Sequence, residues 1–468
     1  MSTDTKFILK YEHGGVRNLS YETLQDNSGK LQKEMSRKAL LGSTVGTIIE
    51  WYDFFLYATA SALIFPKLFF PTTDPYMATI LSFATLATGF LARPLGAAIF
   101  GHFGDRIGRK NALVITLWII GISSTLIGLL PTYNTVAIWA PIMLITLRIL
   151  QGIGVGGEWA GAILLSMEWG NRKKKGFSAS IPNAGVGAGM LLSSGAVGLC
   201  ISLTGDSFYV WGWRIPFLIS FILLIAGVII RKRITETPSF QRVTEGNQVA
   251  KTPILEVLKH YPKQILFVGM AKFSEHIPNS VFSIFMISYV TGSFSISPSY
   301  MVNLNTFTSF LMCFTIPFFG YLSDKVGIKR LYMTGIIANL IWVFPYIAFI
   351  NTKAPIIIAI ATIIFVFTHN VQAGAQPALV AQAFPARLRY SGAALGTQVA
   401  SVFAGGIAPM VCAYLIHSTG TLYSIGVYVA VAAIIGSIGT AFLKNLSSNS
   451  VTNTKEDHLG SLNTNVNS

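Results

Sequence analysis

Apolar segments long enough to cross a lipid bilayer recur along most of this chain. A hydrocarbon core of about 30 Å requires roughly 20 residues of helix. By this measure the sequence predicts twelve spanning helices, near residues 39–65, 76–101, 112–131, 136–168, 177–204, 211–231, 263–291, 298–322, 331–351, 354–380, 390–416 and 420–443. Only 11% of the residues are charged, against about 25% in soluble proteins. The predicted fold class is an all-α polytopic membrane protein.

A long polar stretch divides the twelve segments into two groups of six. The predicted regions are a cytoplasmic N-terminal tail (1–38), an N-terminal six-helix half (39–230), a cytoplasmic central loop (231–262), a C-terminal six-helix half (263–443) and a cytoplasmic tail (444–468). The C-terminal tail is rich in Asn and Ser and lacks heptads, so we expect it to be disordered.

An internal repeat supports this division. "GHFGDRIGRK" (101–110) follows the second segment and "GYLSDKVGIK" (320–329) follows the eighth, with glycines and an aspartate matching at a constant offset of 219. Two parallel halves of this kind form one transporter architecture, in which the binding site lies between the halves near mid-membrane.

The positions of Lys and Arg predict the orientation. With the N-terminus inside, nineteen of them, Arg231 included, fall in inner loops, whereas only Lys67, Arg214 and Lys353 fall at the outer side. Cytoplasmic loops retain positive charge, so both termini are predicted to be cytoplasmic, and the net charge of +15 is largely this signature. The sequence contains no basic, aromatic-rich soluble domain, so the expected partner is the lipid bilayer and not nucleic acid.

The first predicted helix contains two acids within one turn, in "GTIIEWYDFFLY" (46–57). At 1.5 Å per residue, Glu50 lies roughly 17 Å and Asp53 roughly 21 Å along this helix, close to the bilayer centre. Residues three apart are neighbours on a helix surface, so both acids are expected to point into the bundle. Ionisable groups at this depth indicate an ion or substrate pathway. The alternative is a permanent salt bridge that only holds helices together.

The seventh helix contains "AKFSEHIPN" (271–279), which places Lys272, Glu275 and His276 within about one turn. The offset of 219 relates Asp53 to Lys272, so we expect an acid and a base to face each other across the cavity. In that arrangement an anionic or zwitterionic substrate binds Lys272, while Asp53 or Glu50 takes a proton. The alternative is a Lys272–Glu275 pair internal to the seventh helix.

Other buried polar residues are candidates for the same site. Arg93 can bind a carboxylate in bidentate fashion. Arg148 is a candidate for proton coupling, or else pairs with Glu158 or with the first helix. Uncharged donors often line a cavity or join neighbouring helices, and histidines can titrate near neutral pH. The candidates of these two kinds are His369, Gln372, Gln376 and Gln398.

One tempting motif has a simpler explanation. Gly152, Gly154 and Gly157 spell G-x-G-x-x-G, the dinucleotide fingerprint, but they lie inside an apolar helix with no preceding strand. Close helix packing explains them better, since Gly152/Gly156 and Gly185/Gly189 are small-xxx-small pairs. The sequence shows neither a nucleophile arrangement nor metal-ligand spacing, so no enzyme activity, metal or cofactor is expected.

These motifs resemble those of the major facilitator superfamily. "GHFGDRIGRK" fits its inner-loop signature G-x-x-x-D-R-x-G-R-K, and "RILQGIGVGGEWAGA" (148–162) is similar to its fourth-helix motif. "EWYDFFLY", "QGIGVGGEWAGA" and "FPARLRYSGAALG" (384–396) resemble the metabolite:proton symporter family, which includes permeases for shikimate, proline and betaine, and α-ketoglutarate. The resemblance covers about residues 39–443.

The resemblance also implies gate residues. In the superfamily the inner loops form charge and helix-end contacts that hold the inner gate closed. This role falls here on Asp105, Arg106 and Arg109, with Asp324 and Lys325 as a second copy. Arg387 and Arg389 are expected to act similarly before the eleventh helix. A solvated turn is the alternative for these loops.

The function implied is proton-coupled symport by alternating access, importing a small organic acid or zwitterion into a bacterial cell across the inner membrane. Protons are the coupling ion, and a monomer is expected. An efflux antiporter is the first alternative, but "SIPNAGVGAGML" lacks the G-P-x-x-G-G signature of such exporters. A non-transporting membrane sensor is the second, and the acids and the lysine retained in the first and seventh helices weigh against it.

Overall fold

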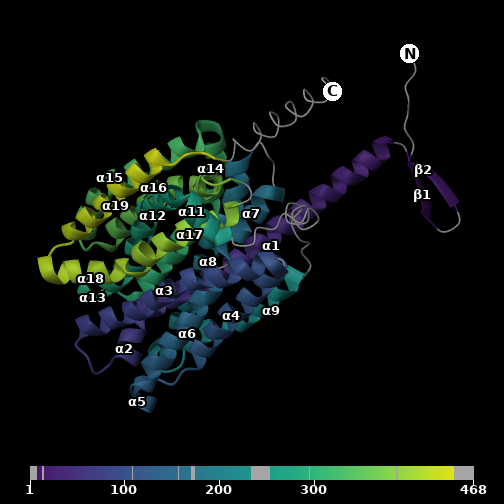
Figure 1. The fold of residues 1–468 in the computed structure, drawn as a ribbon. Coiled ribbons are helices and arrows are strands. Elements are labelled where there is room, and N and C mark those ends of the chain that lie inside the picture. Colours follow the sequence, from purple (N-terminus) through teal and green to yellow (C-terminus); the bar gives the residue numbers. More distant parts are fainter. Residues whose placement is uncertain are drawn as a thin grey trace.

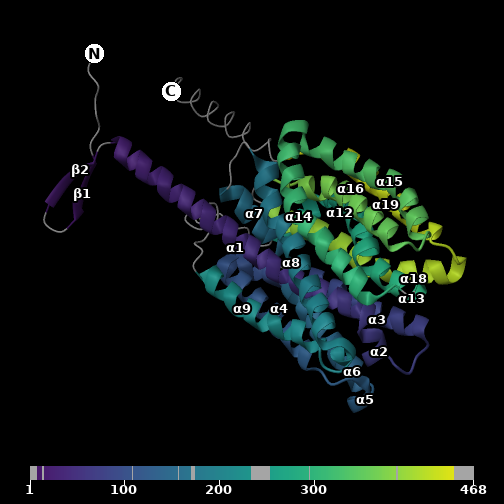
Figure 2. The same cartoon turned by 180° about the vertical axis from the view of Figure 1, so that it is seen from behind.

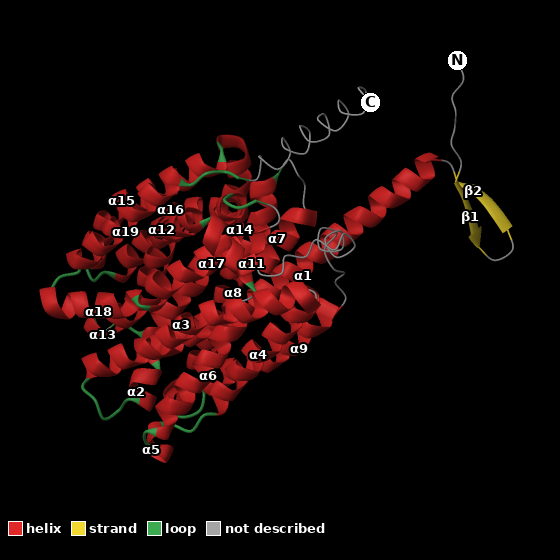
Figure 3. Cartoon of the chain, viewed as in Figure 1, coloured by secondary structure: helices red, strands yellow, loops and turns green. Residues whose placement is uncertain are grey.

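The chain folds into a bundle of long helices, as a computed structural model shows (Figure 1, Figure 3). The structure describes residues 8–12, 15–19, 21–107, 109–156, 158–169, 174–232, 253–294, 296–385 and 388–446. Predictions for the central loop between 233 and 252, and for the tail from 447 onward, fall outside the described residues.

The N-terminal half is built from six spanning elements. They are α1 (Tyr21–Leu63), α3 (Pro75–Ile107), α4 (Arg109–Leu129), α6 (Trp139–Gly156) followed by α7 (Trp159–Trp169), α8 (Lys175–Thr204) and α9 (Arg214–Lys232). Short helices α2 (Phe65–Phe69), α5 (Tyr133–Val136) and η1 (Gly205–Tyr209) join their ends.

The C-terminal half repeats this plan. Four of its spanning elements are single helices: α14 (Pro298–Val326), α15 (Ile328–Ile350), α16 (Pro355–Gln382) and α19 (Tyr423–Phe442). The first span is composite and consists of α12 (Pro262–Ser280), η2 (Val281–Phe285) and α13 (Met286–Ser293). The fifth is also composite and consists of α17 (Arg389–Ala400), η4 (Ser401–Gly406) and α18 (Ala408–Thr419). The segments η2 and η4 are π-helical, a geometry often found at functional sites.

Hydropathy and structure together account for the twelve expected spans. Among the described residues nine helices are long and apolar enough to cross a membrane, and α4 contributes the shorter apolar stretch Leu113–Leu129. The remaining two, α1 and α12, are less apolar because each carries ionisable side chains in its central turns. These are the helices that hold the candidate acids and the candidate lysine.

Three features lie outside the expected bundle. A two-stranded antiparallel hairpin, β1 (Ile8–Glu12) and β2 (Gly15–Leu19), precedes α1, and α1 itself begins at Tyr21 and projects from the bundle (Figure 1). A further short helix, α11 (Pro253–His260), precedes α12. The expected tail and central loop therefore contain regular structure within the described residues.

Contacts between the halves run along the bundle. Helix α8 packs along α14, while α3 packs against η4 and α1 against η2 and α13 (Figure 1, Figure 2). The two colour-coded halves lie side by side in both views, with purple and blue helices beside green and yellow ones. A site between the halves is therefore built from α1, α3 and α8 on one side and from α12, α14, α16 and η4 on the other.

Gly152, the first glycine of the G-x-G-x-x-G series, and the nearby Gly156 serve helix packing. A Cβ at Gly152 would collide with the backbone of Gly89, and a Cβ at Gly156 with the carbonyl of Arg93, both in α3. Gly189 likewise meets the backbone of α1 at Ile48. These close approaches fix how α6 and α8 lie against the helices that carry the candidate site, as the small-xxx-small interpretation predicted.

Candidate functional site

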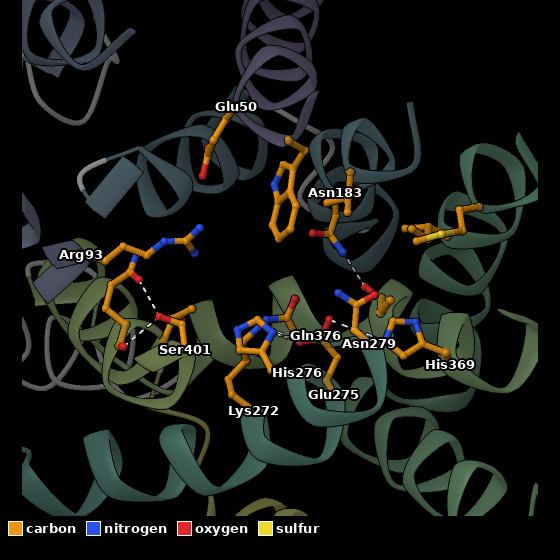
Figure 4. Close-up of a pocket in the computed structure, with 17 residues that line it drawn as sticks. Glu50, Arg93, Asn183, Lys272, Glu275, His276, Asn279, His369, Gln376 and Ser401 are labelled. Atoms are coloured by element: carbon orange, nitrogen blue, oxygen red, sulfur yellow. Dashed lines mark hydrogen bonds and ion pairs between the residues drawn. The ribbon is translucent and has the colours of Figure 1, made fainter. Parts of the chain in front are cut away.

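A cavity of about 40 Å³ lies between the two halves (Figure 4). Its lining is polar and mostly buried. The polar and aromatic residues that line it are Glu50, Trp51, Arg93, Asn183, Lys272, Glu275, His276, Asn279, His369, Gln376, Thr397, Gln398 and Ser401. Most of the predicted proton or substrate residues are among them, drawn together from α1, α3, α12, α16 and α17.

The N-terminal half contributes an acid and a cation that face the cavity. Glu50 of α1 is buried, and its Oε2 atom has no hydrogen-bond partner among the described residues. Arg93 of α3 is also buried, and its guanidinium packs 4.2 Å from the ring centre of Phe90 and 5.3 Å from that of Phe54. Within the described residues Arg93 forms no ion pair. Figure 4 shows both side chains pointing into the cavity from separate helices.

The C-terminal half contributes a cluster around Glu275. Lys272 Nζ donates to Glu275 Oε2 at 2.9 Å, and His276 Nδ1 lies 3.1 Å from the same oxygen. His369 Nε2, from α16, lies 3.9 Å from Glu275 Oε1. The i, i+3 and i, i+4 spacing on α12 brings the first three side chains to one face.

The expected apposition of Asp53 and Lys272 is wrong. Lys272 is paired with Glu275 on its own helix, which is the alternative that the sequence left open. Asp53 does not line the cavity, because its carboxylate accepts a hydrogen bond from Ser220 of α9 at 2.5 Å. The acid of α1 that lines the cavity opposite Lys272 is Glu50.

Asp53 lies in a polar network inside the N-terminal half. Its Oδ2 atom is buried and makes no hydrogen bond of good geometry within the part of the chain that the structure describes, while Ser124 and the Arg148 guanidinium of α6 lie close enough to interact with the carboxylate. Arg148 donates to Gln151 and lies 4.3 Å from the ring centre of Tyr57. Of the alternatives for Arg148, the structure favours contact with the first helix over pairing with Glu158.

Glu158 belongs to a separate buried ion pair. Its carboxylate binds Arg231, and Thr116 Oγ1 donates to Glu158 Oε2 at 3.4 Å. Arg231, counted among the inner-loop charges, lies instead in the last turn of α9 and is buried. The reason is local: an arginine at a helix end can reach back into the bundle when an acid there lacks a partner.

The glutamines of the C-terminal half divide between cavity and scaffold. Gln398 lines the cavity, and its Oε1 atom accepts a hydrogen bond from Ser401 at 2.9 Å. Gln376 also lines it. Gln372 does not, because it donates to Ser274 at 2.6 Å and accepts from Asn339 at 3.2 Å within its own half.

Several lining residues were missed from the sequence. Asn183 of α8 donates to the carbonyl of Ala373 in α16 at 2.8 Å, which joins the two halves across the cavity. Asn279 lies four residues after Glu275, so its helical spacing could have identified it. Trp51 and Ser401 carried no comparable signal, since aromatic and hydroxyl side chains are common throughout these helices.

The expected inner end of the bundle is held by one of the predicted gate residues. Asp324, in the last turn of α14, accepts hydrogen bonds from the backbone N–H groups of Gly176 at 2.7 Å and Phe177 at 2.9 Å. It thus caps the N-terminus of α8, a favourable position for a negative charge. Lys325 lies 4.6 Å from the ring centre of Tyr321.

The other predicted gate residues lie around the same end. Arg389 Nε donates to the carbonyl of Phe384 at 3.4 Å. Asp105 and Arg106 fall in the last turn of α3, and Arg109 begins α4. The side chains of these three, and Arg387 as a whole, lie outside the described residues.

The opposite end is also joined across the halves. The rings of Tyr76 at the start of α3 and His417 near the end of α18 stack with centres 4.0 Å apart. Phe83 and Phe285 lie 6.5 Å apart further in. Contacts between the halves at both ends enclose a small cavity that contains two cations, two carboxylates and several amides. Such an arrangement is suited to holding a small polar solute and defines a membrane carrier.

Comparisons with known proteins agree. The family described as Sugar (and other) transporter matches residues 39–265, and the Major Facilitator Superfamily matches residues 268–465. The chain is 38% identical to the shikimate transporter of Escherichia coli (strain K12) over 90% of this chain and 97% of that protein. It is 32% identical to the proline/betaine transporter of the same strain over 90% and 86%.

A solved structure of the proton:xylose symporter XylE matches with a TM-score of 0.70 at 16% identity, covering 89% of this chain and 97% of that one. An identity this low supports the fold alone. The family matches and the sequence relatives show that the chain belongs to the major facilitator superfamily and, within it, to the metabolite transporters, and the shared fold agrees with this. It is a membrane transporter and not an enzyme.

Proposed function

We propose that this protein is a proton-coupled symporter that imports a small organic acid or zwitterion. The observation that carries the proposal is the Arg93 guanidinium, which faces the central cavity, has Glu50 as an electrostatic neighbour and forms no direct ion pair within the described residues. A buried cation is costly unless it is paired. A solute carboxylate would supply that partner, and the guanidinium fork can bind it through two hydrogen bonds.

The rest of the cavity suits the remainder of such a solute. The amides of Asn183, Asn279 and Gln398 can exchange hydrogen bonds with hydroxyl or carbonyl groups, and the Trp51 indole offers an apolar face. Glu50, one of whose oxygens has no hydrogen-bond partner within the described residues, can accept from an ammonium or hydroxyl group. The named relatives carry shikimate or proline and betaine, so acids of both kinds are the first solutes to test.

Asp53 is the group that we propose to take the coupling proton. It is fully enclosed, one of its oxygens lacks a hydrogen-bond partner of good geometry among the described residues, and it lies beside Arg148. A carboxylate at this depth is costly to leave charged when its cation moves away. A proton bound at Asp53 would compensate for movement of Arg148 during the cycle.

The proposal also covers the orientation of the protein and the membrane in which it lies. The surplus of Lys and Arg at the end of the bundle that bears Asp324 supports a cytoplasmic location for that end and for both termini. The membrane is then the bacterial inner membrane, in keeping with a relative named as an inner membrane metabolite transport protein. Protons suffice as the coupling ion, with no further cofactor, and a monomer suffices for transport because one chain supplies the whole cavity.

The test is an uptake screen in proteoliposomes. Labelled shikimate, 2-oxoglutarate, proline and glycine betaine are offered with an imposed inward proton gradient, and accumulation is compared with and without a protonophore. At least one solute should accumulate only with the gradient. No accumulation of any of them, with the gradient verified by a pH dye, would refute import by symport, and loss of preloaded solute on acidifying the outside would favour the antiporter.

The role of Arg93 is tested in the same vesicles. Each charge-assisted hydrogen bond contributes about 1.5–3 kcal/mol, so Arg93→Gln should weaken apparent solute affinity by at least about tenfold. Lys67→Gln is the control, because Lys67 lies outside the cavity, over the Tyr209 ring. Unchanged affinity in Arg93→Gln would show that this guanidinium does not bind the solute.

A further inference from the structure

Glu275 is the most heavily contacted acid of the cavity. One of its oxygens accepts from Lys272 at 2.9 Å and lies 3.1 Å from His276 Nδ1, and the other lies 3.9 Å from His369 Nε2. From the opposite half, Arg93 of α3 and Glu50 of α1 face the same cavity. The cluster thus holds a lysine whose charge is already balanced by an acid three residues away.

This pairing conflicts with solute binding at Lys272. The lysine is buried, so its ammonium has little access to water. If a solute carboxylate approached it, two carboxylates would share one cation, and like charges at such distances disfavour ionisation of both. Either the solute stays away from Lys272 or Glu275 gives up its charge.

We propose that Glu275 is a second proton-accepting group of the transport cycle and that its protonation frees Lys272 to bind the solute carboxylate. The inference rests on the proposed symport function and extends it. Glu275 then acts as an internal competitor that occupies the lysine while the cavity is empty. Arg93 can bind the solute carboxylate before Glu275 is protonated, and Lys272 can bind it after Glu275 is protonated.

The proton path follows from the neighbours of Glu275. His369 Nε2 is buried, faces Glu275 Oε1 and has no hydrogen-bond partner in the described part of the chain. A proton from water on the uptake side reaches the carboxylate directly or through this ring, so one O–H or N–H bond breaks in the donor and one O–H bond forms on Glu275. When the solute leaves on the other side, Lys272 pairs again with Glu275 and the proton departs to water there.

Helix α12, which carries the cluster, has two features just after Glu275 that favour bending. Pro278 lies inside α12, and a proline lacks the N–H that would bind the carbonyl four residues earlier. The π-helical segment η2 follows directly. A small bend here changes the position of Glu275 relative to His369 without breaking a regular helix.

Infrared titration of the purified protein tests the proposal without any solute. A carboxylic acid C=O band should appear as the pH is lowered from about 8 to about 3, so that the titration covers the acid side of the ordinary carboxyl range. Glu275→Gln should remove one component of this band, whereas Glu50→Gln and Asp53→Asn should leave that component in place. Lys272→Gln should move it to higher pH by about one to three units, because an adjacent cation favours the charged carboxylate. Lys353→Gln, at the outer surface, should move nothing.

Two results would overturn the proposal. One is a spectrum in which Glu275→Gln removes no component, since Glu275 would then remain ionised throughout. The other is an unshifted Glu275 component in Lys272→Gln, since the pair would then not be coupled. Glu275→Asp serves as a folding control, because it keeps an acid and should keep a band. A negative uptake screen with a titrating Glu275 would instead count against the proposed function alone.

Counterflow of labelled shikimate supplies the transport readout. Glu275→Gln mimics the protonated acid, so exchange should persist and depend less on pH, with the remaining dependence coming from Asp53. If Glu275→Gln abolishes exchange as completely as Lys272→Gln does, the ionised acid itself is required, and the competitor role is refuted.

Discussion

The Asp324 cap of α8 is the contact whose removal should open the inner end of the carrier. Asp324 belongs to α14 and the two N–H groups that it binds belong to α8, so these hydrogen bonds join the two halves. Opening the cavity toward that end must separate α8 from α14 there. Asp324→Ala removes both hydrogen bonds and the negative charge at the helix N-terminus in one step.

The magnitude follows from the geometry. A hydrogen bond to a charged group contributes about 1.5–3 kcal/mol when well shielded. These two lie at a partly exposed end of the bundle, so each is counted at about 0.8–1 kcal/mol, the value of an ordinary hydrogen bond. Together with about 0.3–1 kcal/mol from the helix dipole, roughly 2–3 kcal/mol is lost from the closed state. At about 1.4 kcal/mol per factor of ten, the population open at this end should rise about 30- to 150-fold.

Alkylation of a single cysteine measures this population. Ser180 of α8 is fully buried in the same seam, where a Cβ at Gly320 of α14 would collide with its hydroxyl. Ser180→Cys is made in a background without Cys200, Cys313 and Cys412, and an impermeant maleimide is applied to inside-out vesicles. The alkylation rate should follow the open population and rise by the same factor in Asp324→Ala.

Asp74→Ala is the matched control. Asp74 also caps a helix, since its Oδ1 atom accepts from the N–H groups of Tyr76 and Met77 at 3.1 Å, but all of these residues lie in one half. Its loss should leave the alkylation rate unchanged. If Asp324→Ala also leaves the rate unchanged, or if both variants raise it equally, the capping contact does not hold this end closed.

Three further outcomes are expected. Asp53→Asn should abolish proton-driven accumulation while solute exchange at equal pH persists, and unchanged concentrative uptake would exclude Asp53 as the coupling site. Glu158→Gln leaves Arg231 buried without its counter-ion, so stability should fall by about 3–5 kcal/mol, seen as a lower melting temperature of the purified protein. A Glu158→Leu, Arg231→Leu double variant should recover much of that loss, and failure to do so would show that the pair adds net stability. Gly152→Ala should cost about 1–3 kcal/mol by overpacking α6 against α3, and a melting temperature equal to that of wild type would show that the helices can separate freely.

The sequence predicted the fold well because membrane helices leave a strong one-dimensional signal. Spans such as 298–322 and 331–351 were placed within a few residues of α14 and α15, since long apolar runs are bounded by charged loops. The helices extend further at the expected inner end, because amphipathic turns there continue beyond the hydrocarbon core. The hairpin before α1 was not foreseen, as a polar segment carries no hydropathy signal.

The residues that line the cavity could be predicted from the sequence where they are charged. Arg93, Lys272 and Glu275 are so costly in an apolar helix that their presence there is itself a sign of a functional site. Pairing was not predictable in the same way. Arg231 was assigned to a loop although it pairs with Glu158, because a long side chain at a helix end can point outward or inward and the choice depends on a partner 73 residues away.

The different surroundings of Glu50 and Asp53 could not be predicted from the sequence. Residues three apart on an α-helix are neighbours on its surface, yet at 3.6 residues per turn they differ by about 60° around the axis. On α1 this angle turns Glu50 toward the cavity and Asp53 toward Ser220 of α9. A movement of α1 relative to α6 and α9 that brings Glu50 onto a solute would therefore also displace Asp53 from Ser220 and Arg148. The helix itself then couples the solute-facing acid to the proposed proton-bearing acid, with no direct contact between solute and proton.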